Sequence, residues 1–349
     1  MQDATTRSLD VLVPQGRDVF IDYAGGVTLP GHAVHDPINF HALAAATGGA
    51  FHASVATIRR DRRAVLVLIP RRVERAIDAA RALKNAGHAV LVTWKECGAH
   101  QLAMAAKDPD HEVNMRVLAG MADAWLAASP AAHAAITAMV PAVRCVSLPT
   151  PYPVDVPGWR FALPLAAREG IIIGTREWSV AARRHGDAVR LAVDLARRHP
   201  GLRVTCINTD GLRGRWRLAR ARDRGMNVHA IMPMEYPAYL RCLASHRLVL
   251  QRDGSGVPGQ VAGDAILAGT PCLGGGGMID RLVFPHLPGA DDDDAAVFAA
   301  ADRLLADEGA WEACMAEARQ HAGQAVSFAA FRRQWNAIAP TLGDQRPSI

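Results

Sequence analysis

Short apolar runs alternate with amphipathic, helix-length segments along almost the whole chain. In the first half, the apolar runs fall at 64–70, 89–93, 124–128 and 143–148. Apolar residues within 71–87 recur at helical spacing, as expected of a helix that covers one face of a sheet. Continuous β-branched runs separated by such helices are typical of parallel strands buried on both faces. The pattern therefore predicts a parallel α/β sheet in the first half.

The second half repeats this alternation. Between the halves, Pro149–Pro157 holds four prolines in nine residues, which forbids a continuous helix or a central strand. We expect an α/β fold of two Rossmann-like, doubly wound domains, 1–150 and 151–325, joined by an extended linker and facing a cleft. The predicted strands of the second half are 170–173, 202–207, 227–231, 247–250 and 271–273, and its predicted helices are 186–198, 213–224, 236–245 and 259–268.

Composition excludes several classes of protein. The chain has 349 residues, of which 50% are hydrophobic and 21% are charged, so it can bury a sizeable core and is not largely disordered. It contains no apolar run near the roughly 18–20 residues that span a bilayer, and Met1–Asp10 lacks a signal-peptide core. The six cysteines are scattered without a Cys-x-x-Cys pair, which argues against a disulfide framework or a zinc ribbon and favours the cytoplasm.

The surface is basic. The formal charge is +5, and Arg59–Arg63 with Arg71 and Arg72 form the densest cluster, in the N-terminal domain. This cluster is either a solvated face or a surface that attracts an anionic membrane or a phosphate-bearing ligand, which would make the protein peripheral at the inner face of the membrane. Aromatic residues make up 5% of the chain and no nucleic-acid motif accompanies the arginines, so we expect no nucleic-acid partner.

A small-residue loop, 253–259, follows one predicted strand of the second half and leads into a helix. Ligands of open parallel sheets bind beyond the carboxyl ends of the strands, where Gly254, Ser255 and Gly256 would let backbone amides approach a phosphate at a helix N-terminus. The Asp264 carboxylate, within that helix, would accept hydrogen bonds from two ribose hydroxyls. The alternative is a flexible connector followed by a solvated helix acid.

Two further segments end at the same edge. Gly274–Gly277 would cradle an anion through its backbone or form a plain turn. Gly174–Arg176 follows the first strand of the second half, and Arg183 and Arg184 come shortly after it. Two fixed cations there would neutralise a diphosphate, although Arg183 and Arg184 taken alone would equally suit the surface of an amphipathic helix. The acidic run Asp291–Asp294 is expected to cap the helix 295–305 rather than to hold a metal ion.

Candidate acid and base groups in the first half are fewer. Lys95–Gly98 follows a predicted strand, which directs Glu96 toward the cleft. His32, His35 and His41 lie close together, but not at the spacing of a helical zinc site, so we expect no metal. The sequence contains no nucleophile elbow, Walker loop or dinucleotide fingerprint.

On these residues, the second half resembles the donor domain of nucleotide-sugar glycosyltransferases with the GT-B fold, of the family 4 type (glycosyl transferases group 1). That family has Gly-Arg after a strand and Lys-Gly further on, where this chain has Gly174–Arg176 and Arg184–Gly186. Ala268–Pro271 matches the family's Ala-Gly-(Thr/Val)-Pro. Of the two glutamates that precede this motif in the family, eight residues apart, the second corresponds to Asp264. The first corresponds to Gly256, a departure for which Asp253 could substitute.

The resemblance covers about residues 143–290 and implies transfer of a sugar from a nucleoside diphosphate donor to an acceptor held by the N-terminal domain, without a metal or other cofactor. It also implies that a C-terminal segment, 326–349, crosses back onto that domain. Lys95 and Glu96 stand where the family has a His-Asp pair, so Glu96 or His35 would act as the acid or base. The acceptor is left open among a glycan, a lipid-linked glycan, a protein and a small molecule. The implied donor-binding residues are Arg176, Arg184, Asp253, Gly254, Ser255, Gly256, Asp264, Gly274 and Gly275.

Two other functions stay open on the sequence. A nucleotide-sugar epimerase shares this architecture and would need acid and base groups around one bound sugar, without an acceptor. A degenerate, non-catalytic binding or scaffold protein would explain the glycine at position 256 and the missing histidine.

Overall fold

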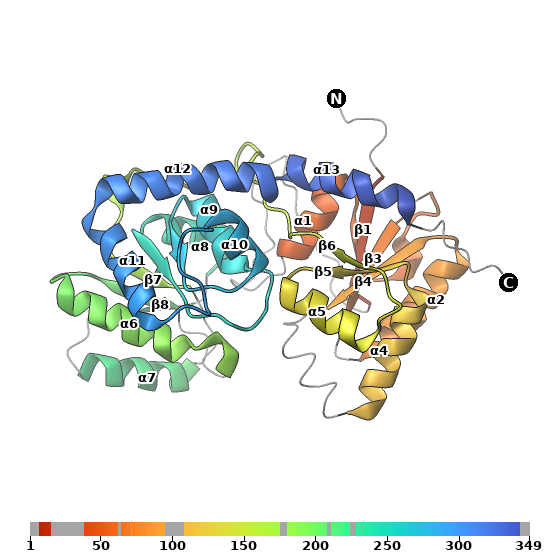
Figure 1. Cartoon of the computed structure of the whole chain (residues 1–349), viewed down its shortest axis with the longest axis horizontal. Helices are drawn as coiled ribbons and strands as arrows, with labels where there is room; N and C mark the ends of the chain where they lie inside the picture. Colours follow the sequence, from red (N-terminus) through yellow and green to blue (C-terminus); the bar gives the residue numbers. More distant parts are fainter. Residues whose placement is uncertain are drawn as a thin grey trace.

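Two parallel sheets, each flanked by helices, form the two halves of the molecule (Figure 1). This computed structural model describes residues 7–14, 38–61, 64–70, 72–94, 108–174, 180–207, 211–223, 228–232 and 234–342. The arrangement confirms the predicted α/β fold class of two doubly wound domains. It also adds elements that the apolar pattern did not predict, among them a two-residue strand in the first half and a six-residue helix in the second.

The first sheet has six parallel strands in the order β2-β1-β3-β4-β5-β6. Its strands are β1 (Leu9–Leu12), β2 (Phe51–His52), β3 (Ala64–Ile69), β4 (Ala89–Trp94), β5 (Ala124–Ala127) and β6 (Cys145–Ser147). The accompanying helices are α1 (Ile38–Thr47), α2 (Val73–Asn85), α4 (Pro109–Met121) and α5 (Pro130–Met139).

The second sheet has five parallel strands in the order β11-β10-β7-β8-β9. Its strands are β7 (Ile171–Ile173), β8 (Val204–Ile207), β9 (Val228–Ile231), β10 (Leu248–Leu250) and β11 (Cys272–Leu273). The helices of this half and beyond are α6 (His185–Arg198), α7 (Gly211–Asp223), α8 (Tyr236–Ala244), α9 (Gln260–Ala268), α10 (Met278–Val283), α11 (Asp294–Ala306), α12 (Glu308–Ala325) and α13 (Phe328–Ile338).

The chain reverses its direction across the second sheet between β7 and β10. From β7 it runs outward through β8 to β9, and it then returns to the other side of β7 through β10 and β11. The carboxyl ends of β7 and β10 therefore flank a topological switch point, which is where open α/β sheets bind ligands. Gly174 and Gln251 are the first residues beyond those two strands.

Alternate residues of the central strands enter cores on opposite faces. Leu66 and Leu68 of β3 belong to the apolar cluster that includes α1, whereas Val65 and Val67 belong to the cluster that includes α2. Burial on both faces explains why this strand reads as an unbroken apolar run in the sequence. The first cluster continues through Tyr152 and on to the helices of the second half, so one core extends across both halves.

The proline-rich linker and α13 cross between the halves together, and α12 and α13 run along the top of both in Figure 1. The Tyr152 N–H donates to the Val326 carbonyl oxygen at 2.7 Å. The Asp155 carboxylate accepts hydrogen bonds from the first amides of α13, those of Phe328 and Ala329, each at 3.0 Å. A carboxylate at a helix N-terminus satisfies orphan amides and complements the helix dipole.

Beyond this crossing, α13 lies against α1 of the first half. Trp335 is fully buried there and its indole N–H donates to the Arg7 carbonyl oxygen at 2.5 Å. Arg7 in turn donates to the Ala339 carbonyl oxygen at 2.8 Å. Helix α13 thus completes the packing of the first half. Among the described helices, none has the length and apolar character needed to cross a bilayer.

We expect Gly263→Ala to destabilise the protein and Gly120→Ala to stabilise it. A Cβ at position 263, in α9, would lie 2.0 Å from Cζ of the Tyr152 ring, and this ring belongs to the linker crossing. Overpacking of this kind costs about 1–3 kcal/mol. At Gly120, in α4, a Cβ would meet no described atom within 4 Å, so alanine should add up to about 1 kcal/mol through helix propensity. Urea unfolding of both variants measures the difference, and equal effects would contradict the packing described.

Candidate functional site

Gly174 gives helix α9 close access to the switch point. A Cβ at this position would lie 2.4 Å from Cγ1 of Val261, in the first turn of α9, and 3.0 Å from Cγ1 of Val249 in β10. The Gly174 N–H donates to the Leu250 carbonyl oxygen at 2.9 Å, which ties the two strand ends together. Only glycine leaves room for this approach, so the switch point is closely packed on its α9 side.

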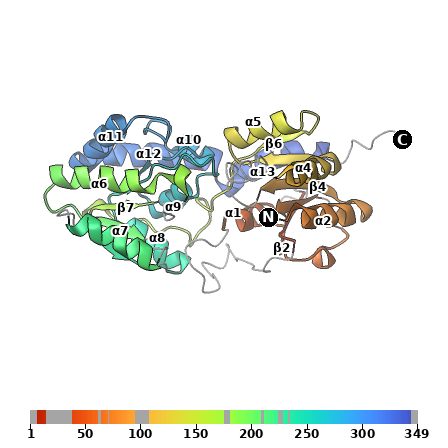
Figure 2. The ribbon, with the colours of Figure 1, turned by 90° about the horizontal axis from the view of Figure 1, so that it is seen from below.

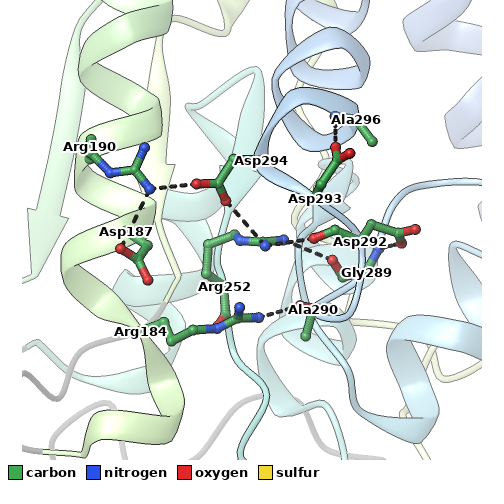
Figure 3. Close-up of polar contacts among 10 residues, drawn as sticks. All are labelled: Arg184, Asp187, Arg190, Arg252, Gly289, Ala290, Asp292, Asp293, Asp294 and Ala296. Carbon is green, nitrogen blue, oxygen red and sulfur yellow. Dashed lines mark hydrogen bonds and ion pairs between the residues drawn. The ribbon is translucent and has the colours of Figure 1, made fainter.

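Arg184 occupies the switch point from the side of α6. Its backbone has a left-handed φ of 41°, immediately before the helix begins. Its Nε donates to the Arg252 carbonyl oxygen at 3.0 Å, and its Nη2 donates to the Ala290 carbonyl oxygen (Figure 3). This half-buried guanidinium joins the start of α6 to the loops that follow β10 and precede α11. The structure thus places Arg184 at the edge where the sequence predicts it.

Arg252 lies beside Arg184 and is 3% exposed. Its Nη1 donates to the Gly289 carbonyl oxygen at 3.0 Å and its Nη2 to the Asp292 carbonyl oxygen at 2.7 Å. The same Nη2 lies 3.2 Å from Oδ1 of Asp294. Burial, and after it the charge of Arg184, lowers the pKa of the Arg252 guanidinium. Two cations therefore lie side by side at one sheet edge, and the Asp294 carboxylate pairs with the more buried of them.

The acidic run before α11 has two roles. Asp293 caps the helix by accepting a hydrogen bond from the Ala296 N–H at 2.7 Å, which confirms the predicted cap. Asp294 instead bridges Arg252 and Arg190, as Figure 3 shows. The hydrogen bond from Arg190 is the main cause that lowers the pKa of Asp294. The run therefore joins α11 to α6 and to the arginines at the switch point.

The loop after β10 is folded in on itself. The Asp253 carboxylate accepts hydrogen bonds from the Ser255 N–H at 2.9 Å and from the Ser255 hydroxyl, and both residues are buried. Gly254 is exposed, and its N–H donates to the Ala182 carbonyl oxygen at 3.0 Å. In this conformation Asp253 shapes the loop, and Gly254 is the part of it that faces solvent.

Gly256 connects this loop to the first half. Its carbonyl oxygen accepts a hydrogen bond from the Ser129 hydroxyl at 3.1 Å, and Ser129 is the N-cap of α5. Its φ of 71° is a left-handed conformation that disfavours any residue with a Cβ. The glycine at the position of the family's first glutamate therefore accompanies a backbone shape that a glutamate would strain.

Asp264 is sealed inside the second half. It is 0% exposed, and its Oδ1 accepts a hydrogen bond from the Tyr236 hydroxyl. Gly263 beside it packs directly on the Tyr152 ring. A ribose would reach this carboxylate only after neighbouring side chains move, so the predicted ribose contact stays a prediction.

The Gly274–Gly277 loop uses its glycines for close packing. A Cβ at Gly274 would lie 1.8 Å from the Gln251 carbonyl oxygen, and one at Gly275 would lie 2.0 Å from Oδ1 of Asp280. The amides of Gly274, Gly276 and Gly277 donate within the chain, to Pro288, Asp253 and Asp280 respectively. In this conformation those three amides are not available to an anion, so of the two sequence interpretations the closely packed turn fits better.

Asp280 anchors that loop. Its Oδ1 accepts a hydrogen bond from Nε2 of Gln251 at 2.8 Å, and its Oδ2 accepts one from the Gly277 N–H at 3.1 Å. Burial, followed by the nearby charge of Asp253, raises the pKa of the Asp280 carboxyl from its ordinary 3.8 to about 7. A buried carboxyl held by two donors thus ties the loop after β11 to the end of β10.

Two cavities border this region. One of about 210 Å³ lies beside the Gly274–Gly277 loop, and its polar lining includes Asp280, Arg281, Asp291 and Asp292. A second cavity, of about 350 Å³, is mostly apolar and lies between the halves. It is lined by Pro130, Pro149, Met278, Arg281, Leu282, Ala325 and Gln334.

Three predicted site residues, Glu96, His35 and Arg176, lie outside the described residues and stay predictions. Within the described ranges no group of three His, Cys, Asp or Glu residues is arranged to hold a metal ion. His41 stacks on Phe51 with ring centroids 3.9 Å apart, and burial lowers the pKa of this histidine to about 4.

Sequence reasoning missed Arg252, Asp280 and Ser129. Arg252 could have been found, because a charged residue two positions after a buried strand lies at the ligand-binding edge of the sheet. Asp280 and Ser129 carry no such signal, since their roles depend on contacts with distant loops.

No protein-family model matches the chain, and no curated protein matches it either. Solved structures do share its architecture. Sucrose-phosphate synthase from Thermosynechococcus elongatus is 15% identical over 96% of this chain and 98% of that one, with a TM-score of 0.63. Anabaena HepE in complex with UDP-glucose is 13% identical over 96% and 100%, with a TM-score of 0.62. A variant of S. aureus TarM is 10% identical over 79% and 55%, with a TM-score of 0.59. These similarities establish the GT-B fold for this chain.

The raised pKa of Asp280 predicts a pH-dependent stability. Between about pH 4 and 7 the folded protein holds this proton, whereas the unfolded chain has lost it. The contribution of Asp280 to the free energy of unfolding is therefore full below about pH 4 and declines as the pH rises toward 7. We expect Asp280→Asn to gain stability relative to the parent as the pH rises through this window, measured by urea unfolding. Parallel curves for the two proteins would contradict the assignment.

Proposed function

We propose that this protein is a glycosyltransferase that moves a sugar from a nucleoside diphosphate donor to an acceptor. The observation that carries the proposal is the pair of adjacent guanidiniums, Arg184 and Arg252, at the switch point of the second sheet in a GT-B fold. Anabaena HepE, which has this architecture, has been solved in complex with UDP-glucose and with UDP. The donor would be of the same chemical class, held by the second half, and the sequence motifs favour the family 4 type.

Transfer of a glycosyl group leaves a nucleoside diphosphate, whose developing negative charge must be stabilised. Arg184 uses its Nε and Nη2 to hold two loops, which fixes its guanidinium in place while leaving further N–H groups for a phosphate. Arg252 is too deeply buried to be a main contact, and we assign it the positioning of Arg184 and part of the field. We propose that these arginines, with Arg176, take the place of a metal ion.

The acceptor side would be supplied by the first half. Glu96, which follows the apolar run 89–93, or His35 would remove or hold the acceptor proton. The Ser129–Gly256 hydrogen bond joins the donor loop to the start of α5, so an acceptor bound near α5 would approach the donor sugar.

A second candidate function, a non-catalytic nucleotide-binding subunit, has a specific observation in its favour. Three positions of the family motif do not present a side chain to a donor in this conformation. Gly256 lacks a side chain, the Asp253 carboxylate bonds within its own loop, and the buried Asp264 carboxylate bonds Tyr236. Such a protein would bind a nucleoside diphosphate at Arg184 without turning over a sugar.

Incubation with a panel of uridine, guanosine and adenosine diphosphate sugars, followed by product analysis, tests these functions. Transfer to an acceptor, or slow hydrolysis to free sugar and nucleoside diphosphate, supports the glycosyltransferase. A changed sugar on an intact nucleotide would indicate an epimerase. Calorimetric binding without any product would indicate the non-catalytic subunit.

Arg184→Gln should weaken binding of a nucleoside diphosphate by about ten- to a hundred-fold and leave the bare nucleoside almost unaffected. A charged hydrogen bond is worth about 1.5–3 kcal/mol, and this one would meet phosphate rather than base or ribose. Arg197→Gln is the matched control, because Arg197 lies on α6, the helix that follows Arg184, is exposed and pairs with Asp194. Calorimetry with UDP and uridine measures both. Equal losses for the two ligands would place Arg184 away from the phosphates.

Asp264→Asn and Tyr236→Phe together test the ribose contact. If the Asp264 carboxylate binds both ribose hydroxyls, its Asn variant should lose the preference for UDP over 2′-deoxy-UDP, because the paired acceptor geometry is gone. Tyr236→Phe removes only the neighbouring hydroxyl that donates to Asp264, so the preference should remain. If Asp264→Asn keeps the preference and both variants only lose stability, Asp264 has a structural role.

A further inference from the structure

Helix α7 has an unusual composition for a surface helix. Its sequence, Gly211–Asp223, holds five arginines, and its single acid is the last residue. Leu212 is 80% exposed and Trp216 is 58% exposed, which makes them the two most exposed large apolar side chains among the described residues. Large apolar side chains that gather on a protein surface commonly mark an interaction site.

The exposed apolar residues lie on one face of α7. Gly214 and Leu218 are buried and turn toward the sheet. Leu212, Trp216 and Ala219, at spacings of four and three, form a stripe on the opposite side. The helix lies at the outer surface of the C-terminal half in both views (Figures 1 and 2), and the three residues of the stripe are exposed.

Arginines flank the apolar stripe. Arg213 and Arg220 are exposed next to it, and the Arg220 guanidinium lies 4.2 Å from the centroid of the Trp216 ring. An apolar stripe with Trp and Leu between cations matches the interface of a bilayer, where acyl chains lie below the headgroup phosphates. Trp is a common side chain at that depth, because its ring is amphipathic.

We propose that α7 docks on the surface of an anionic bilayer, with Leu212 and Trp216 inserted among the lipids and the flanking arginines on the phosphates. This proposal does not depend on the proposed function. It differs from the membrane contact that the sequence suggests for the N-terminal half. In the N-terminal half, Arg59 donates two hydrogen bonds to Asp61, at 3.1 and 2.8 Å, so the charge of Arg59 is matched within the chain.

A nucleic acid would also attract the arginines but fits the stripe less well. Leu212 is the most exposed side chain of the stripe. Its aliphatic side chain neither stacks on a base nor donates a hydrogen bond to a phosphate. Single-strand binding relies on successive aromatic side chains that stack on bases, whereas Trp216 is the single aromatic residue of α7. The observations therefore favour a lipid surface.

Co-sedimentation of the full-length protein with vesicles tests the proposal. We expect binding to phosphatidylcholine vesicles that contain phosphatidylglycerol, little binding to phosphatidylcholine alone, and a decline with salt above about 150 mM. Arg213→Gln with Arg220→Gln should lower the partition coefficient at least about tenfold, since each basic residue near such a surface contributes a several-fold factor. Leu212→Ser with Trp216→Ser should lower it by a similar factor.

Two matched double variants are the controls. Arg59→Gln with Arg60→Gln removes the same charge from the N-terminal half, and Val113→Ser with Val117→Ser removes exposed apolar side chains from α4. Both should bind vesicles like the parent. A parent that does not bind, or controls that lose as much binding as the α7 variants, would overturn the proposal. So would tighter binding to a single-stranded oligonucleotide, measured by anisotropy, that the α7 substitutions abolish. Circular dichroism verifies that each variant is folded.

Discussion

A guanidinium that is almost wholly buried must be matched by acceptors, and Arg252 is matched by the carbonyl oxygens of Gly289 and Asp292 and by the Asp294 carboxylate. Leaving such a charge unmatched would cost about 3–5 kcal/mol. The segment before α11 therefore has to lie across the carboxyl end of β10. Arg184 reaches the same segment from α6. The edge where β7 and β10 diverge is thus built from three parts of the chain that are distant in sequence, and two arginines join them.

Specific hydrogen bonds also join the two halves. Two of the described sets of contacts differ in kind: the linker residues Tyr152 and Asp155 hold the start of α13, and Ser129 bonds Gly256. The linker and α13 belong to one continuous core, whereas Ser129 and Gly256 meet through a single hydrogen bond. A neutral hydrogen bond contributes about 1 kcal/mol, so the halves can separate at this point more readily than at the linker.

The sequence predicts the sheets well because their strands are buried on both faces, as in β3, and read as unbroken apolar runs. It does not predict β1, β2 or α10, because segments of two to six residues are too short to show a recognisable periodicity. At the site, Arg184 is predicted from the motif it shares with the family, Arg184–Gly186 in the place of Lys-Gly. The packing of Asp264 against Tyr236 and the pairing of Asp280 with Gln251 depend on side chains brought together only by the fold, so no local pattern indicates them.

The position of α13 has a consequence for synthesis of the protein. The first half begins near the start of the chain, with Leu9 in its first strand. Helix α13, which holds the buried residues Phe331 and Trp335, packs against α1 of that half. These two residues are translated some 300 residues after Leu9. Domains commonly fold in order as they leave the ribosome. Here the first half leaves the ribosome with the apolar surface of α1 exposed, and this surface stays exposed until the second half and α13 have been translated. Chaperones or transient packing would have to shield that surface until translation has passed α13.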